Sequence, residues 1–253
     1  MTLEEMYAEF KFMLDKVASS SAPLFLESEI KMLLNIAQDK FITKRLYGNN
    51  VRRTGFEEDQ KRRDDLRTLI HQANLTPREY SYFIFGEPGY HVDEDKFSTL
   101  FFELPYSSAP YREYRHALLE SAVIETVRVE DSNRTVPVKP IALDRYHKIM
   151  DDPFNKPHKD TVYRLDYGGQ ASSATDEPKA GFMQLVFDKD QNVTNYLLKY
   201  LAHPLAIGHN NTYGCQLPTH THREIVRMAV VEALEGIESP RYQSSKIELN
   251  EIE

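Results

Sequence analysis

The sequence predicts an α+β protein, in which an N-terminal helical bundle is joined by a C-terminal helix, with a central antiparallel β-rich insertion and an extended C-terminal tail. Apolar residues recur at helical spacing through the first quarter of the chain and again after residue 215. Between these stretches the helical period is lost, and most of the 13 prolines fall there. We therefore expect a helical bundle over 1–75, a β-rich insertion over 76–214, a helix over 215–237 that packs on the bundle, and a tail over 238–253.

Three helices are predicted in the N-terminal bundle. Thr2 and Glu5 form a capping box, in which each side chain accepts a hydrogen bond from a backbone N–H that the helix start leaves unpaired. A second helix is predicted over 28–47, because basic residues occupy its last turn and a glycine follows it. A third is expected over 54–73, since its first four residues repeat the capping-box pattern. The first two helices should bury Leu3, Met6, Tyr7, Phe10, Met13, Leu14, Val17, Ile30, Leu33, Leu34, Ala37 and Phe41.

The middle of the third helix carries a run of mixed charge, Lys61-Arg62-Arg63-Asp64-Asp65, which interrupts its apolar stripe. A solvent-exposed face is the ordinary interpretation of such a run. The alternative is a contact with a neighbouring subunit, because Arg side chains pair with carboxylates through two parallel hydrogen bonds. A nucleic-acid patch is the third and weakest interpretation, since the acidic residues nearby cancel most of the positive field.

Strands are predicted across the centre of the chain. The β-rich stretch 123–129, the turn residues 131–133 and the extended stretch 135–141 together indicate a hairpin. Pro137 and Pro140 lack a backbone N–H, so they should confine the second strand to a sheet edge or lie at its ends. Because the strands follow one another with little helix between them, we expect antiparallel pairing. The further strand candidates are 161–167, 182–187 and 193–201.

Helical spacing returns near the C-terminus. Thr221 and Glu224 form a further capping box, Gly236 ends the helix and Pro240 prevents it from resuming. The apolar stripe of this helix must be buried on another element, and the N-terminal bundle is the available partner. The residues from Tyr242 onward have little apolar content, so the tail should be ordered only when it docks on another subunit. The stripe consists of Ile225, Val226, Ala229, Val230, Ala233 and Leu234.

The composition argues against several classes of protein. With 31 basic and 39 acidic residues, the formal net charge is −8, which disfavours a nucleic-acid-binding module. The chain has no run of about 18 apolar residues, so we expect no membrane span, and the acidic first residues are unlike a secretory signal. The single cysteine, Cys215, forbids an intrachain disulfide and fits a reducing compartment. The 15 tyrosines favour partner surfaces, though only weakly.

Histidines near the C-terminus are the strongest candidates for chemistry. His203, His209, Cys215, His220 and His222 lie close together in the sequence, and His and Cys are common zinc ligands. Their spacing matches no zinc motif, because the chain has neither HExxH nor CxxC. Glycine-rich phosphate loops and nucleophile elbows are absent as well. We therefore expect no enzyme activity and no cofactor or metal; a soluble zinc-dependent hydrolase that uses the four histidines is the alternative.

Short blocks of sequence are spread over most of the chain. They read PVKPIALDRY at 137–146, DPFNKP at 152–157, VYRL at 162–165, YLLKY at 196–200, HPLAI at 203–207, LP at 217–218, HREIV at 222–226 and AV at 229–230, with LEEMY at 3–7 and GFEE at 55–58. Together these blocks resemble virion structural proteins of crAss-like tailed phages that infect Bacteroidetes. The chain departs from that pattern at Ile141-Ala142-Leu143, where a more polar stretch with a histidine is expected.

The resemblance implies a subunit of the head–tail connector, a dodecameric collar below the portal that forms part of the channel for the genome. It implies identical subunits, the portal protein and other tail or ring proteins as partners. Double-stranded DNA would pass through without specific binding, and no membrane would be involved. The resemblance places the protein in the portal–tail region of the virion, after synthesis in the bacterial host cytoplasm, and it assigns no catalytic residues.

Three segments are the best candidates for contacts with other subunits: the charged middle of the third helix, the loop at 152–157 and the tail after 238. A ring can be built by heterologous contacts that close on rotation. The individual candidates are Lys61, Arg62, Arg63, Asp64, Asp65, Pro153, Phe154, Asn155, Lys156, Pro157 and Tyr242.

Overall fold

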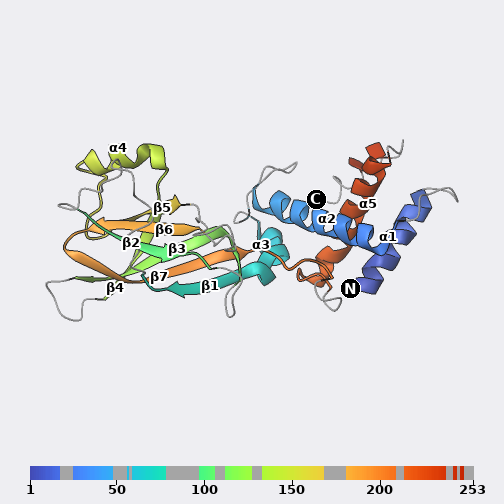
Figure 1. Cartoon of the computed structure of the whole chain (residues 1–253), viewed down its shortest axis with the longest axis horizontal. Helices are drawn as coiled ribbons and strands as arrows, with labels where there is room; N and C mark the ends of the chain where they lie inside the picture. The colour runs from blue at the N-terminus through green and yellow to red at the C-terminus, as the bar shows by residue number, and fades with distance from the viewer. Residues whose placement is uncertain are drawn as a thin grey trace, which may run out of the picture. The chain divides into compact units, whose positions relative to one another are not determined.

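The chain forms two compact units (Figure 1). The computed structural model describes residues 1–17, 25–47, 56, 59–77, 97–105, 112–126, 133–167, 181–208, 214–237, 242–243 and 246–247. One unit, here called the helical unit, consists of Met1–Leu69 and Pro204–Glu253, and the other, the sheet unit, consists of Ile70–His203. Helices near both ends and a central sheet confirm the predicted α+β class.

The helical unit is built from α1 (Leu3–Val17), α2 (Glu27–Leu46), α3 (Gln60–Leu66) and α5 (His222–Gly236), with short 3₁₀ turns at Arg67–Leu69 and Thr219–Thr221. The predicted capping box at the start of α1 is confirmed. The Thr2 N–H donates to the Glu5 carboxylate at 2.8 Å, and the Glu5 N–H donates to the Thr2 hydroxyl at 3.2 Å. Among the described residues, no helix combines the length and the hydropathy that a transmembrane segment requires.

Helix α5 packs against α1 and α2, which buries its apolar stripe in the core of the helical unit. The prediction of a capping box at Thr221 and Glu224 is wrong. A 3₁₀ turn precedes α5, so Thr221 has a helical backbone and its hydroxyl donates to the Pro218 carbonyl at 2.8 Å. The Glu224 carboxylate instead accepts hydrogen bonds from Arg45 on α2. The fully buried residues of this core include Met6, Phe10, Leu34, Phe41, Ile225, Val226 and Ala229.

The third predicted helix is shorter than expected. Helix α3 ends at Leu66, and after one 3₁₀ turn the chain enters strand β1 (Ile70–Leu75). Within β1 the side chains of Ala73 and Leu75 are buried, and those of Gln72 and Asn74, which alternate with them, are exposed. This alternation is the pattern of a strand with one buried face, and pairing with a distant strand decides the conformation. The capping box predicted at 54–57 lies outside the described residues, apart from Phe56.

The sheet unit contains a seven-stranded mixed sheet. Beside β1, its strands are β2 (Phe97–Glu103), β3 (Tyr114–Thr126), β4 (Arg134–Pro140), β5 (Val162–Tyr167), β6 (Phe182–Asp188) and β7 (Gln191–Ala202). Their order in the sheet is β1-β7-β3-β4-β5-β6-β2. Each neighbouring pair is antiparallel except β4 and β5, which are parallel. Among the strands that the structure describes, this pair alone departs from the expected antiparallel pairing.

Strand β4 lies inside the sheet, between β3 and β5, although it contains two prolines. Pro137 pairs with Ser121 at the end of the ladder with β3, and the ladder with β5 begins at the next residue. Pro140 closes the second ladder opposite Arg164. The edge alternative is therefore wrong. Pro140 lies at the end of the strand as expected, whereas Pro137 lies in its middle, at the point where one ladder ends and a missing N–H is tolerated.

Two clusters of apolar side chains hold the sheet unit together. Strands β3, β6 and β7 contribute to the larger cluster, in which Tyr196 and Tyr200 are fully buried. Helix α4 (Tyr146–Asp151) lies over β5 and β6, and its Tyr146 packs with Tyr163 and Val186 in the smaller cluster (Figure 1). Both faces of β5 and β6 are thus covered, which explains why β6 reads as a nearly continuous buried run.

Candidate functional site

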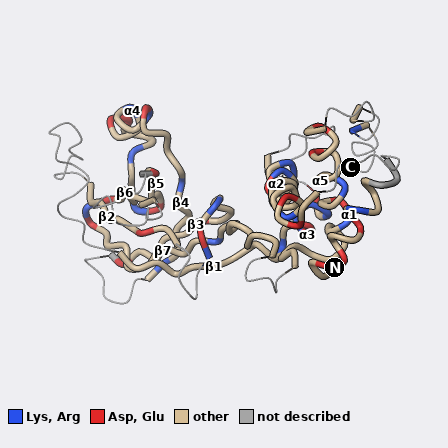
Figure 2. The backbone as a smooth tube through the Cα atoms, turned by 45° about the vertical axis from the view of Figure 1, so that its right-hand side comes forward, with Lys and Arg blue, Asp and Glu red and all other residues tan. Residues whose placement is uncertain are grey.

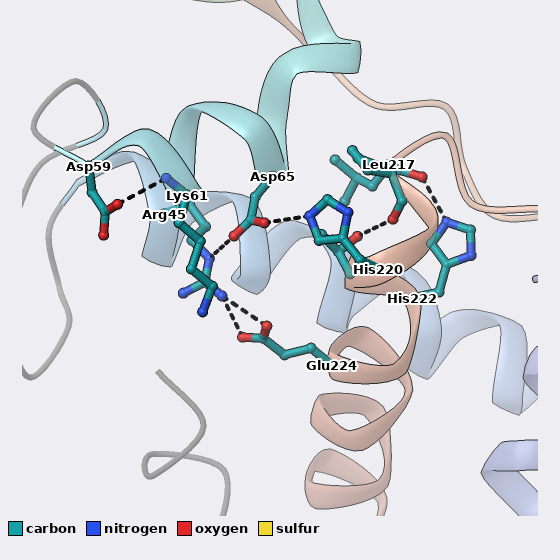
Figure 3. A network of polar contacts seen from close by, with 10 residues as sticks. Arg45, Asp59, Lys61, Asp65, Leu217, His220, His222 and Glu224 are labelled. Atoms are coloured by element: carbon teal, nitrogen blue, oxygen red, sulfur yellow. Dashed lines mark hydrogen bonds and ion pairs between the residues drawn. The ribbon is translucent and has the colours of Figure 1, made fainter.

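A buried polar network joins three elements of the helical unit (Figure 3). Arg45, in the last turn of α2, donates from Nε to Asp65 of α3 at 2.9 Å. Its Nη2 donates to both carboxylate oxygens of Glu224 on α5, each at 2.8 Å. The guanidinium carbon lies 4.8 Å from the centroid of the Phe41 ring. One cation therefore ties the ends of α2, α3 and α5 together.

The central pair of the network, Arg45 and Asp65, is almost inaccessible to water. The side chains of Arg45 and Asp65 are each 2% exposed. The second oxygen of Asp65 lies 2.8 Å from His220 Nε2, so both carboxylate oxygens are satisfied. Burial raises the pKa of Glu224, and the positive charge of Arg45 partly offsets this rise. The arrangement is suited to fixing the helices against one another.

His222, at the start of α5, is held in one tautomer (Figure 3). Its Nε2 donates to the Leu217 carbonyl at 2.7 Å, and its Nδ1 accepts from the Met1 ammonium at 3.0 Å. Burial lowers the pKa of His222, which favours the neutral ring. Because both ring nitrogens are already hydrogen-bonded, His222 has no free lone pair for a metal ion.

The structure does not assemble the histidines into a metal site among the residues it describes. His203 belongs to the sheet unit, and His220 bonds to Asp65 in the helical unit. No group of three or more His, Cys, Asp or Glu side chains within those ranges has the geometry to hold a metal ion. His209, the fourth predicted ligand, lies outside the described residues.

Cys215 should be a poor nucleophile in the folded protein. Burial raises the pKa of its thiol to about 11. Because the thiolate is the reactive form, we expect Cys215 to react with Ellman's reagent at pH 8 on the order of a hundredfold more slowly than an unfolded-state cysteine. Stopped-flow absorbance in buffer and in denaturing urea measures both rates. Equal rates in the two conditions would show that the thiol is open to solvent.

A second buried polar network lies in the sheet unit. The guanidinium of Arg164 on β5 pairs with Glu120 on β3 and, at 3.0 Å from its Nε, with Asp166. The Tyr196 hydroxyl on β7 donates to the other oxygen of Glu120 at 2.8 Å. Burial raises the pKa of Tyr196, and the charge of Glu120 raises it further, so the hydroxyl remains a donor. The network links three strands across the sheet.

Polar side chains of α2 bind the segment 205–208, which enters the helical unit after the sheet. The Asn35 side chain accepts from the Ile207 N–H at 2.7 Å and donates to the Ile207 carbonyl at 3.4 Å. Lys31 and Gln38 donate to other carbonyls of the same segment at 2.8 and 3.2 Å. The three side chains follow one another about one helical turn apart, so one face of α2 forms hydrogen bonds with the backbone of this segment.

The candidate contact residues of α3 divide into two groups. Lys61, Arg63 and Asp64 are exposed, as expected for a solvated face or a subunit contact. Arg62 and Asp65 are buried within the helical unit, and Asp65 belongs to the Arg45 network. For these two residues the interpretation as an exposed face is wrong, because both side chains are buried, and Asp65 contacts Arg45 and His220, which lie far away in the sequence.

The loop at 152–157 follows α4 and is mostly exposed. Phe154 is 87% exposed, and Pro153, Asn155 and Lys156 are exposed beside it. Pro157 is buried and anchors the end of the loop. Tyr242, the candidate in the tail, is half-buried in a helical stretch, and its ring contacts Lys246. The structure therefore brings Phe154 and its neighbours together on one turn.

The comparisons with known proteins identify the family. A sequence profile described as "Phage tail ring protein 3/4" matches residues 1–243. The chain belongs to this family. It is also 25% identical to "Ring protein 3" of Bacteroides phage crAss001 over 247 residues, which cover 92% of this chain and 95% of that protein. The resemblance to crAss-like phage proteins is therefore confirmed, and so is the class of structural virion ring protein.

Several blocks that carried the resemblance occupy structural positions in this ring-family chain. The YLLKY block provides Tyr196 and Tyr200, which fill the core of the sheet unit. The HPLAI block provides Ile207, which α2 binds through Asn35. In the HREIV block, Glu224 contacts Arg45. In this chain, these three blocks therefore supply contacts that stabilise the fold.

Proposed function

We propose that this chain is a subunit of the head–tail connector, in a ring below the portal that encloses part of the channel for the genome. The single observation that carries the proposal is the family match over residues 1–243. We propose twelve copies per ring, with the portal protein and other ring or tail proteins as neighbours. Heterologous contacts between copies would close the ring on rotation.

The structure of the chain is compatible with a role in a large assembly, because each unit is internally cross-linked and exposes apolar side chains. Each unit has a buried ion network that ties its elements together, through Arg45 in the helical unit and Arg164 in the sheet unit. Large exposed apolar side chains occur on both units, as an assembly that buries them requires. The exposed candidates Lys61, Arg63, Asp64, Pro153–Lys156 and Tyr242 remain our proposed contact residues.

The negative net charge of the chain favours a channel wall that does not bind DNA tightly. The formal net charge is −8, and Figure 2 shows Lys and Arg interspersed with Asp and Glu along the helical unit. Tight binding to duplex DNA needs a basic surface that neutralises several phosphates. A wall without such a surface lets the genome slide past.

Mass measurement of the purified chain tests this proposal. Native mass spectrometry or mass photometry, on the protein alone and mixed with its portal protein, should show a discrete closed oligomer in at least one sample. The closed oligomer should not retain duplex DNA at physiological salt. A protein that stays monomeric in both samples, or a ring that binds duplex DNA tightly, would overturn the proposal.

A further inference from the structure

The loop after α4 is a rigid turn held by Asp152. Its carboxylate accepts from the Phe154 N–H at 2.9 Å and from the Asn155 side-chain amide at 2.7 Å. Its carbonyl accepts from the Lys156 N–H at 3.0 Å, and the Tyr163 hydroxyl of β5 donates to the Asn155 carbonyl. The hydrogen bond from Asn155, followed by that from Phe154, lowers the pKa of Asp152, so the carboxylate stays charged and bonded.

This rigid turn presents an apolar side chain to water. Phe154 is 87% exposed, more than any other large apolar side chain among the residues that the structure describes. A turn that is already fixed loses little conformational entropy on binding, so its aromatic side chain can act as an anchor. We define Asp152–Lys156 as the Phe154 turn.

The helical unit carries a different exposed apolar surface on α2. Met32 is 59% exposed and Ile36 is 39% exposed. They lie one turn apart, and Glu29 precedes them by a further turn on the same face. This face points away from the buried side of α2, which faces α5. We define Glu29, Met32 and Ile36 as the outer stripe of α2.

We infer that the Phe154 turn of one subunit docks on the outer stripe of α2 in the next copy of this chain. The inference rests on the proposed ring. A heterologous ring contact needs two different, complementary surfaces on each copy, and these two surfaces lie on different units of the chain. Phe154 would pack on Met32 and Ile36, and the flexible, unbranched side chain of Met32 adapts well to an aromatic ring.

Charge complementarity supports the same pairing. Lys156, beside Phe154, and Lys159 are exposed, and Asp151 at the end of α4 is the nearest exposed carboxylate. Asp152 is hydrogen-bonded within the turn, and Asp160 pairs with Arg134, so the two lysines leave the turn with a basic flank. The first turn of α2 carries Glu27 and Glu29, at the N-terminal end of the outer stripe. A basic flank on the turn thus meets an acidic flank on the stripe, which fixes the orientation of the contact.

Mixed cysteine variants test the contact between copies. Phe154→Cys and Met32→Cys are made in separate proteins, each with Cys215→Ser, and the two proteins are assembled together. A short thiol-reactive crosslinker should yield a covalent dimer only in the mixture. A mixture of Phe154→Cys with Arg227→Cys, a position exposed on α5, is the matched control and should yield no dimer.

Assembly of Phe154→Asp provides the second readout. We expect it to need at least about tenfold more protein for half-maximal ring formation than the wild type does, as for loss of an anchor residue. Leu119→Asp, at another exposed apolar residue of the sheet unit, should assemble like the wild type. Far-UV circular dichroism confirms that both variants fold.

The outcomes separate this inference from the proposed function. If wild-type rings form, but the mixture gives no dimer and Phe154→Asp assembles normally, the inference is overturned and the ring stands. If Phe154→Asp forms rings but loses binding to the portal, the turn docks on another protein and the inference is also overturned. If the wild type forms no ring alone or with its portal, the proposed function and the inference both fail.

Discussion

Arg45→Ala should lower the free energy of unfolding of the helical unit by about 3–5 kcal/mol. The substitution leaves the buried Asp65 and the partly buried Glu224 without their shared cation, and both carboxylates lose charge-assisted hydrogen bonds of 2.8–2.9 Å. Urea unfolding followed by circular dichroism at a helical wavelength measures the change. The expected loss is a large fraction of the stability of a typical domain, so we also expect a marked drop in the thermal midpoint.

Lys40→Ala is the matched control on the same helix. It removes the 2.6 Å ion pair between Lys40 and Glu232, in which the lysine side chain is about half exposed. An exposed pair of this kind contributes at most about 1 kcal/mol, because water and salt screen it. If Arg45→Ala and Lys40→Ala were equally mild, the Arg45 network would not be a closed, desolvated cluster.

The stability deficit of Arg45→Ala should depend on pH, because the variant changes the environment of the Glu224 carboxyl. Burial raises the pKa of this carboxyl, so the folded state binds its proton more readily than the unfolded state does. The charge on Glu224 therefore costs stability in full above the raised pKa of the folded state. This cost falls as the pH drops through that pKa, and it is gone below the pKa of the unfolded state. Without Arg45 this cost is larger, so the stability deficit of the variant relative to the wild type should shrink on acidification.

Local chemistry made parts of this fold predictable from the sequence. The capping box of Thr2 and Glu5 involves residues three positions apart, and it forms as predicted. The strands predicted at 161–167, 182–187 and 193–201 are bounded by prolines and turn residues, and they form β5, β6 and β7. Each of these signals depends on neighbours in the sequence, which the sequence displays directly.

Contacts with residues far away in the sequence determine the conformations and the burial that the sequence did not predict. Residues 70–73 continue a helical pattern, yet they form a strand because Ala73 pairs with Leu198 of β7. Asp65 reads as part of an exposed charge run, and it is buried by Arg45, 20 residues away, and His220, 155 residues away. Arg45 itself reads as a cation placed for the helix dipole, and nothing local in the sequence points to its contact with Glu224.

The partners of Arg164 were missed for the same reason. Arg164 lies in an apolar strand, which is a weak sign that a buried charge has a partner, but its partner Glu120 is 44 residues away. The sheet network is therefore visible only once β3, β5 and β7 are placed.

Arg164→Ala should destabilise the sheet unit by about 3–5 kcal/mol, because Glu120 then remains buried without a counter-ion. The double variant Arg164→Met with Glu120→Leu should recover most of this loss, since two apolar side chains replace the pair and the Tyr196 hydroxyl keeps its contact with the Met183 sulfur at 3.3 Å. Urea unfolding followed by tyrosine fluorescence measures both variants. A double variant as unstable as Arg164→Ala would mean that the charges themselves, and not the filling of the sheet interior, hold β3, β5 and β7 in register. A single variant as stable as the wild type would mean that water reaches Glu120.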